Sequence, residues 1–402
     1  MNTVKKIYCR VFQTVFRIAI PLLPYREPEI IRSLPDVPAV LTREGCSRVL
    51  IITDTGIRSL GLLDSLETAL QSSGIFYTIY DRTVPNPTTV NIAEAEALYL
   101  QENCQAIIGF GGGSSMDCAK ATGARIAKPK QPLSKMAGIL KVHRKLPLLI
   151  AVPTTAGTGS ETTLAAVITD AETRHKYVIN DFPLIPACAV LDPAVTLSLP
   201  PFITATTGMD ALTHAVEAYI GRSTTKKTRK QALDAVQLIF ENLDTAYTDG
   251  HNEEARRNML LAAYKAGCAF TVSYVGYVHA VAHSLGGEYN VAHGLANAVL
   301  LPFVLEAYGS VIHKKLADLA VAAHVADETT PVETAAANFI QAVKDMKKRF
   351  NIGDTFPEIR EEDIPRLARY ADAEGNPLYP VPVLMDAKEL EKFYYCVMEK
   401  QA

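Results

Sequence analysis

Five side chains able to bind a metal fall into two short stretches of this sequence. In chain order they are Asp210 and His214 in GMDALTHAVEAY, and His279, His283 and His293 in GYVHAVAHSLGGEYNVAHGL. Side chains spaced four residues apart, as in the first two pairs, share one face of a helix. One carboxylate and several imidazoles form a ligand set for Zn²⁺ or Fe²⁺. The spacing predicts a catalytic metal site with one histidine left over for proton relay.

A glycine-rich stretch, GFGGGSSMDCAK, follows an apolar run and opens a helical pattern. Backbone N–H groups and a helix N-terminus can bind a phosphate at such a turn, and glycine lets the anion approach. The stretch matches neither the G-x-G-x-x-G fingerprint nor the Walker A motif. A tight strand-to-helix turn explains it equally well. Lys120 at its end either reaches a ribose or phosphate or lies on a solvated helix face.

A second polar turn, PTTAGTGSETT, also follows an apolar run. Its hydroxyl and N–H groups suit an anion or a nicotinamide amide, although Thr158 or Ser160 could simply cap a helix. Asp54 ends another run, where it either binds ribose hydroxyls and repels a 2′-phosphate or caps a helix. Two polar turns at the carboxyl ends of strands in one sheet favour a nucleotide site.

The order of elements predicts an α/β domain followed by a helical one. Apolar runs of strand type alternate with helical patterns, the runs lying at 48–53, 76–81, 106–111, 148–153 and 187–192 and the helical patterns at 59–74, 89–103 and 116–127. This alternation predicts a Rossmann-like parallel sheet covered on both faces. Long helical patterns take over beyond Pro200–Pro201. We expect a lead-in at 1–44, a dinucleotide-binding domain at 45–200 and an all-α metal-binding domain at 201–402.

The composition narrows the class of protein. Of 402 residues, 48% are hydrophobic and 21% charged, and the net charge of −3 gives no sign of nucleic-acid or membrane-surface binding. Seven scattered cysteines without a CxxC pair suit a reducing cytoplasm.

The beginning of the chain, MNTVKKIYCRVFQTVFRIAIPLLP, has too short an apolar stretch to span a bilayer. Ile7, Val11, Val15 and Ile18 have helical spacing. This predicts an amphipathic helix docked on the protein or on a partner subunit, with reversible membrane attachment through its basic flank as the alternative.

The motifs GGGSSMDCAK, PTTAGTGSE, GMDALTHAVEAY and VHAVAHSLGGEYNVAHGLANAVLLP resemble, in order and spacing, those of the iron-containing (group III) alcohol dehydrogenases. The resemblance covers residues 45 to 400. It implies a dehydroquinate synthase-like architecture, with a dinucleotide-binding α/β domain and a helical domain. The stretch before residue 45 and GNPLYPVPVLMDAKEL near the end depart from the family pattern.

The resemblance also assigns roles to individual residues. It implies that Asp210, His214, His279 and His293 hold the metal, with His283 beside the substrate and nicotinamide. It implies that cofactor-binding residues are Asp54, Asn86, Gly111, Gly112, Gly113, Ser114, Asp117, Thr154, Thr155, Thr158 and Lys176. Asp54 matches a position associated with NAD rather than NADP.

The expected reaction is hydride transfer between a primary alcohol and NAD, or the reverse from an aldehyde. Fe²⁺ is the family expectation, although the donor set also suits Zn²⁺. Alternatives are a dehydroquinate synthase-like lyase, a 4-hydroxybutyrate or diol dehydrogenase of the same family, a metallohydrolase, or a metal-binding paralogue without turnover. We expect a small-molecule substrate, no nucleic acid, no stable membrane span, and a cytoplasmic homodimer or higher homo-oligomer.

Overall fold

The computed structural model describes residues 1–399, and the chain forms two compact units. Pro24–Ser198 make an α/β unit, and Met1–Leu23 join the chain from Leu199 onward in a helical unit. The expected lead-in, 1–44, is therefore divided between the two units. Residues from Pro24 group with the α/β unit because a short strand within them extends its sheet.

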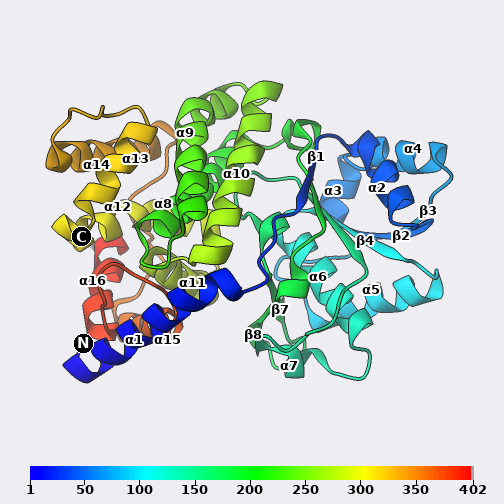
Figure 1. The fold of residues 1–402 in the computed structure, drawn as a ribbon, viewed down its shortest axis with the longest axis horizontal. Helices are drawn as coiled ribbons and strands as arrows, with labels where there is room; N and C mark the ends of the chain where they lie inside the picture. The colour runs from blue at the N-terminus through cyan, green and yellow to red at the C-terminus, as the bar shows by residue number, and fades with distance from the viewer. Residues whose placement is uncertain (400–402) are drawn as a thin grey trace. The chain divides into compact units, whose positions relative to one another are not determined.

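The α/β unit is built on a six-stranded sheet in which every pairing is parallel (Figure 1). In spatial order the strands are β1 (Glu29–Ile31), β9 (Cys188–Val190), β6 (Leu148–Pro153), β4 (Ala106–Gly111), β2 (Arg48–Ile52) and β3 (Phe76–Tyr80). The five strands expected from the apolar runs all form and lie side by side. β1 adds an edge strand that the sequence reading did not anticipate.

Helices cover both faces of this sheet, as the sequence predicts. They are α2 (Val37–Arg43), α3 (Thr55–Ser59), α4 (Asp64–Ser72), α5 (Thr89–Gln101), α6 (Gly113–Ala127) and α7 (Leu133–Met136). Leu66 of α4 packs in one buried cluster with Ile51 and Ile108, whereas Ile92 of α5 packs in another with Leu50 and Ile107. Successive strand residues point to opposite faces, so continuous apolar strands supply both cores.

Two details of the α/β unit differ from the sequence reading. The helix expected at 59–74 begins only at Asp64, as α4, because the chain turns at Gly61 with a φ of 67°; the short α3 lies before that turn. A small second sheet also forms from β5 (Gly138–Ile139), β8 (Lys176–Asn180) and β7 (Ala165–Thr169). The pairing of β7 with β8 is antiparallel.

The helical unit consists of long helices joined by short turns, as expected beyond Pro200–Pro201. They are α8 (Pro201–Ile220), α9 (Lys226–Thr248), α10 (Glu253–Ser273), α11 (Tyr277–Tyr289), α12 (His293–Tyr308), α13 (His313–Ala322), α14 (Val332–Arg349), α15 (Ile364–Gly375) and α16 (Ala387–Val397). Sixteen of the twenty residues of α8 are buried, which makes it the central helix of this unit.

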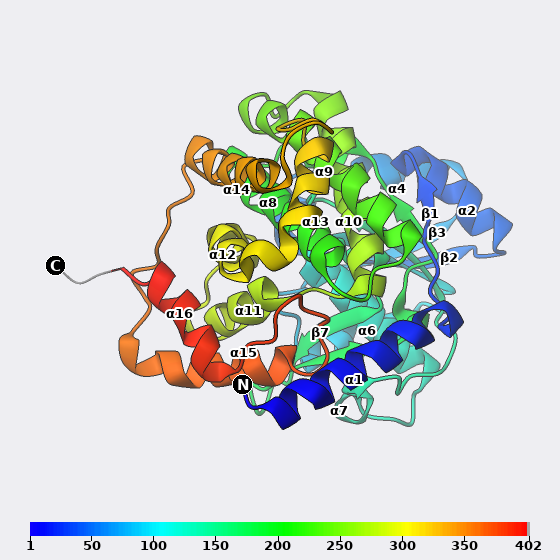
Figure 2. The same ribbon diagram turned by 60° about the vertical axis from the view of Figure 1, so that its left-hand side comes forward.

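The first helix of the chain, α1 (Thr3–Ala19), docks on the helical unit beside α15 (Figure 2). A docked helix here is one of the two outcomes that its apolar spacing predicts. Elsewhere in the described residues, one stretch, His293–Ala322, is long and apolar enough to span a membrane. Its most apolar window is 61% buried inside the unit, which is typical of a core helix.

Candidate active site

Three helices of the helical unit bring together the four residues predicted as metal ligands. Asp210 and His214 lie on α8, His279 lies on α11, and His293 is the first residue of α12. One donor atom from each lies within 4.8 Å of the others, and only His293 is more than slightly exposed. Spacing alone relates residues within one helix, whereas the fold brings Asp210 and His214 of α8 together with one histidine from each of α11 and α12.

The carboxylate of Asp210 lies at the centre of the cluster. Its Oδ1 is 3.5 Å from His293 Nε2 and 4.0 Å from His279 Nε2, and it accepts a 2.7 Å hydrogen bond from Asn297. The ring of His214 stacks on that of His279, with centroids 4.5 Å apart. A carboxylate surrounded by three imidazoles is an oxygen and nitrogen donor set suited to a divalent cation.

Close packing between α8 and α12 fixes the approach of His293. A Cβ added to Gly294 would lie 2.5 Å from the carbonyl oxygen of Thr206 on α8. Only glycine therefore lets the first turn of α12 reach this depth. α11 runs through Gly286 and Gly287 and ends at Tyr289, where Asn290 caps it with a φ of 56°.

Glu217 supports the cluster from behind, and sequence reasoning missed it. Its buried carboxylate accepts hydrogen bonds from the backbone N–H groups of Gly276 (2.9 Å) and Val278 (2.8 Å) and from His279 Nδ1 (2.6 Å). It thereby caps the N-terminus of α11 and orients the His279 ring. Glu217 is seven residues after Asp210 and three after His214, so helical periodicity could have placed it on the same face.

The state of His279 allows a direct test of whether this site fits a metal. Burial, with the neighbouring histidines, holds the pKa of His279 well below its ordinary value, so the ring is neutral. Its Nδ1–H donates to Glu217, which leaves the lone pair on Nε2. Among the described residues, that buried Nε2 has no hydrogen-bond partner. A buried orphan acceptor directed at a carboxylate is what a metal ligand requires.

His283, predicted as the extra histidine, lies at the more exposed edge of the cluster. Its ring stacks on that of His293, with centroids 5.1 Å apart, and its side chain is 42% exposed. Its Nδ1 lies 2.6 Å from the carboxylate of Glu374, which also accepts a 2.6 Å hydrogen bond from Tyr379. No sequence pattern points to Glu374, which is 91 residues away on α15.

The Glu374 carboxylate is poised to stabilise a protonated His283. Burial alone would raise the pKa of Glu374, but the charge and hydrogen bond of His283, with the hydroxyl of Tyr379, lower it below its ordinary value. The carboxylate therefore stays ionised and holds the His283 ring at Nδ1.

The predicted nucleotide residues of the α/β unit gather where the strand order reverses. From β2 the chain runs outward to β3 and then back across β2 to β4 on its other side. Such a switch point between β2 and β4 is where open α/β sheets bind their ligands. Asp54 lies in the loop after β2. The three glycines form the turn from β4 into α6, since Gly111 ends β4, Gly112 caps α6 and Gly113 begins it.

The glycine loop and Asp54 contact each other. Gly111 has a φ of 147°, and a Cβ on it would lie 2.6 Å from Ser115 Oγ and 3.7 Å from Asp54 Oδ2. Asp54 accepts a hydrogen bond from the Ile57 N–H, so it caps α3 as one of its two predicted roles requires. Among the described side chains none caps α6, and its first N–H groups remain available for a phosphate.

The second polar turn lies alongside the glycine loop. Pairing of β4 with β6 sets Gly111 opposite Pro153, and the Thr154 N–H donates to the carbonyl of Gly111. Thr155 faces Gly112, and Thr158 faces Gly113. This juxtaposition of the two turns is the arrangement that the sequence predicts.

Three further predicted residues form a polar group beside this loop. Lys176 Nζ donates a 2.6 Å hydrogen bond to the side chain of Asn86, whose own N–H donates to Ser114 Oγ. Asn86 adopts a φ of 56°, a left-handed conformation that asparagine tolerates.

Asp117 and Lys120 fix the second turn to α6. Asp117 accepts hydrogen bonds from Ser160 Oγ and from the Val167 N–H, and burial raises its pKa. Lys120 is 1% exposed and donates to Ser160, Thr163 and the carbonyl of Ala165. The expectation of a solvated position for Lys120 was wrong, because these buried acceptors hold its ammonium group. Contact of Lys120 with a ribose or phosphate stays a prediction.

The fold and the site define a class of enzyme that combines a dinucleotide-binding sheet with a carboxylate–histidine metal centre. Two family models match the chain: "Iron-containing alcohol dehydrogenase" over residues 31–193 and "Fe-containing alcohol dehydrogenase family, C-terminal" over residues 204–396.

Individual relatives agree with these models. The chain is 39% identical to 1,3-propanediol dehydrogenase of Klebsiella pneumoniae, over 83% of this chain and 87% of the relative. It is 35% identical to the NAD-dependent methanol dehydrogenase of Bacillus methanolicus, over 84% and 89%. The solved alcohol dehydrogenase from Oenococcus oeni superposes with a TM-score of 0.87 at 33% identity, over 92% and 99%.

This chain belongs to the iron-containing alcohol dehydrogenase family. It is an oxidoreductase that depends on a metal ion and NAD and transfers hydride between an alcohol or aldehyde and the nicotinamide. The expected fold class is confirmed, with a parallel sheet in the α/β unit and helices in the other.

Proposed function

We propose that this chain interconverts small primary alcohols or diols and their aldehydes, with Asp210, His214, His279 and His293 holding Fe²⁺. The observation that carries the metal assignment is the buried His279 Nε2, which Glu217 turns toward Asp210. Neutral imidazole nitrogens and one carboxylate would also accept Zn²⁺. Iron is the choice that the family supports.

The protein positions the reactants, and the two cofactors supply the redox chemistry. When bound, the metal supplies a Lewis acid for the alcohol oxygen and the nicotinamide accepts the hydride. His283 accepts the hydroxyl proton at Nε2 during oxidation and returns it during reduction. Glu374 holds Nδ1 of that ring and stabilises its protonated form. The exposed edge of His283 then passes the proton to solvent.

The α/β unit binds NAD in this proposal. The N–H groups of Gly111, Gly112, Gly113 and Ser114 face the pyrophosphate at the start of α6. Asp54 accepts hydrogen bonds from the ribose hydroxyls and repels a 2′-phosphate, which favours NAD over NADP. The remaining proposed contacts come from the polar group and second turn around that loop, Asn86, Asp117, Thr154, Thr155, Thr158 and Lys176.

The names of the relatives support a small substrate. One relative is a 1,3-propanediol dehydrogenase and another a methanol dehydrogenase, so short alcohols and diols are the first candidates. We further propose that the enzyme acts in the cytoplasm as a homodimer or higher homo-oligomer. Its seven cysteines are free thiols, which is consistent with a reducing compartment.

The test is an alcohol and aldehyde screen with NAD(H) and NADP(H), on protein reconstituted anaerobically with Fe²⁺ or Zn²⁺. We expect metal-dependent net formation of NADH with a short alcohol or diol. NAD bound tightly without net NADH across the panel would instead favour the lyase reaction. Full activity after chelation and dialysis would overturn the metal mechanism.

A further inference from the structure

The helix α1 is docked with its apolar face outward. Val4, Ile7, Val11, Val15 and Ile18 recur every three or four residues and therefore share one face. All five are exposed, from 56% for Val11 to 78% for Val4. An amphipathic helix of a globular protein ordinarily buries this face, so its exposure needs an explanation.

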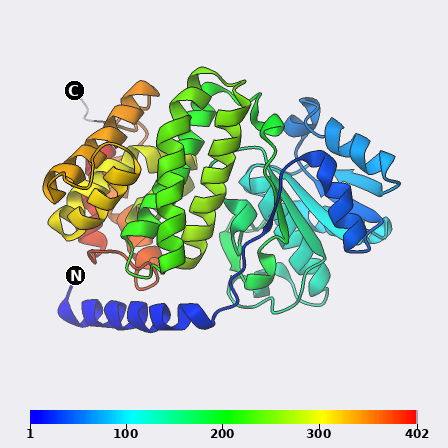
Figure 3. The same ribbon diagram turned by 45° about the horizontal axis from the view of Figure 1, so that its top comes forward.

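The opposite face of α1 is polar and is fixed to the helical unit by specific contacts. Gln13, which is 3% exposed, donates to the carbonyl of Tyr379, and Arg10 donates to those of Val381 and Pro382. Figure 3 shows α1 as one straight helix along the outside of this unit. These bonds hold the helix in one rotation about its axis.

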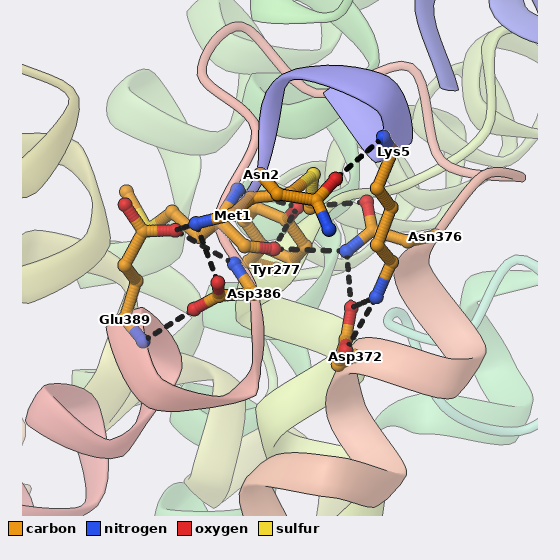
Figure 4. Close-up of polar contacts among 9 residues, drawn as sticks. Met1, Asn2, Lys5, Tyr277, Asp372, Asn376, Asp386 and Glu389 are labelled. Carbon is orange, nitrogen blue, oxygen red and sulfur yellow. Dashed lines mark hydrogen bonds and ion pairs between the residues drawn. The ribbon is translucent and has the colours of Figure 1, made fainter. Parts of the chain in front are cut away.

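Ion pairs at the start of α1 fix that end as well (Figure 4). Lys5 Nζ pairs with Asp372 at 2.7 Å, and the Met1 amino group pairs with Asp386 and Glu389. Asp372 in turn accepts a hydrogen bond from Asn376, which also bonds to the buried hydroxyl of Tyr277. These specific contacts fix the polar face of α1 to the helical unit, and the apolar face therefore points outward.

The charge of this segment indicates what covers the apolar face. The first 26 residues contain five basic and no acidic side chains, in a chain whose net charge is −3. Two of the basic residues, Lys6 and Arg17, are exposed on the side of α1 that lies between its docked face and its apolar face. Tyr8 and Phe12 lie at its other border and are also exposed. Apolar residues with basic and aromatic borders match a lipid surface that carries anionic headgroups.

A second copy of the chain fits this face less well. The 17 residues of α1 span about 25 Å, and at a helix width of about 10 Å they offer roughly 250 Å². Stable interfaces bury about 800 Å² on each partner. Pairing two such helices would also bring their cationic borders together.

We propose that α1 is a docked, interfacial membrane anchor that attaches this enzyme reversibly to anionic lipid. The outer side chains of α1 insert among the acyl chains, while Lys6 and Arg17 contact the headgroups. The anchor lies in the plane of the membrane and does not span it.

Vesicle co-sedimentation of the full chain tests this proposal. Vesicles of phosphatidylcholine alone are compared with vesicles that contain about 30 mol % phosphatidylglycerol. We expect the protein to sediment with the anionic vesicles and to be released as salt is raised. Combining Val11→Gln, Val15→Gln and Ile18→Gln should weaken binding by at least about 100-fold, since each apolar side chain contributes roughly tenfold.

Matched variants separate the lipid contact from general effects. Glutamine keeps the helix, and the replaced side chains face solvent, so melting temperature and lipid-free NADH formation should not change. Lys6→Gln with Arg17→Gln should remove the preference for anionic vesicles, at about fivefold per cation. The control, with equally exposed Leu60, Val311 and Val332 changed to glutamine, should bind vesicles as the unmodified chain does.

Two outcomes would overturn the proposal. One is failure of the sedimentation test, in which the original chain stays in the supernatant or the triple α1 variant sediments equally well. The other is lipid-independent association, measured by light scattering, that the triple variant abolishes while vesicles bind neither protein. That result would assign the apolar face to a second copy of the chain.

Discussion

Replacing Glu217 with glutamine removes one charge behind the metal cluster and leaves the shape of the side chain unchanged. The carboxylate accepts three hydrogen bonds, from two backbone N–H groups at the start of α11 and from His279 Nδ1. The amide of glutamine has one acceptor oxygen and presents N–H groups on its other side. At least one buried donor therefore loses its partner, and the His279 tautomer is no longer fixed.

The structure sets the size of the effect. Leaving a buried donor unpaired costs about 1–3 kcal/mol. A changed tautomer places a proton on the very nitrogen that faces Asp210, so metal must compete with that proton. Changes to residues that orient a metal-bound histidine weaken metal affinity by about 10- to 100-fold. We expect a loss in that range for Glu217→Gln, with the larger value if the tautomer changes.

The assay is an anaerobic Fe²⁺ titration of the apoprotein against a competing chelator, with metal content measured after desalting. Tyr219→Phe is the matched control, because it breaks a buried hydrogen bond from the same helix to Asp318 without touching the cluster. The control should lower stability and leave iron affinity unchanged. A folded Glu217→Gln variant that binds iron within twofold of the original would refute this reasoning.

Three further predictions concern other parts of the site. Burial raises the pKa of Glu161 from 4.5 to about 7. Between these pH values the folded protein holds a proton that the unfolded chain releases, so the free energy of unfolding falls as the pH rises from 4.5 to about 7. Between pH 4.5 and about 7, urea unfolding should show that the free energy of unfolding of the original protein falls by up to about 3 kcal/mol relative to that of Glu161→Gln. If the free energies of unfolding of the two proteins changed with pH in the same way, the prediction would be contradicted. Asp54→Asn keeps an N-cap side chain for α3 but removes the negative charge. The preference for NAD over NADP, measured as the ratio of the two kcat/KM values, should therefore fall by about tenfold or more. An unchanged ratio would show that Asp54 does not contact the cofactor. Glu374→Gln should lower kcat at least about tenfold at unchanged iron content and alter the dependence of kcat on pH, whereas Tyr379→Phe should retain most activity. If both variants lowered kcat equally, the contact between Glu374 and His283 would be merely structural.

Much of the fold follows from the sequence because its signals are local. Continuous apolar runs placed five of the six strands of the parallel sheet, and helical periodicity placed the long helices after Pro201. The edge strand β1 has only three residues, and its position depends on pairing with β9, more than 150 residues later. A pairing across that distance leaves no periodic pattern to read.

In the candidate site, too, residues with a local sequence signal were predicted, whereas residues brought together only by packing were missed. The i,i+4 pairs contain three of the four residues that cluster, Asp210, His214 and His279, since helical spacing survives in the fold. The fourth, His293, was assigned through the family resemblance, because spacing alone pairs His279 with His283. Glu374 escaped notice because its contact with His283 arises only when α15 packs on α11. Tyr379 escaped notice because it acts through its hydrogen bond to Glu374. Lys120 was misjudged because its acceptors come from a turn 40 residues away. Burial by distant segments is a property of packing, and no local pattern encodes it.

One measurement tests the division of labour among the histidines most directly. His279→Ala and His283→Ala are reconstituted anaerobically with Fe²⁺, desalted, and assayed for bound iron and for NADH formation. We predict that His279→Ala loses both metal and activity, whereas His283→Ala keeps its iron and turns over slowly. Loss of iron from a folded His283→Ala variant, or full activity without iron in His279→Ala, would contradict the account.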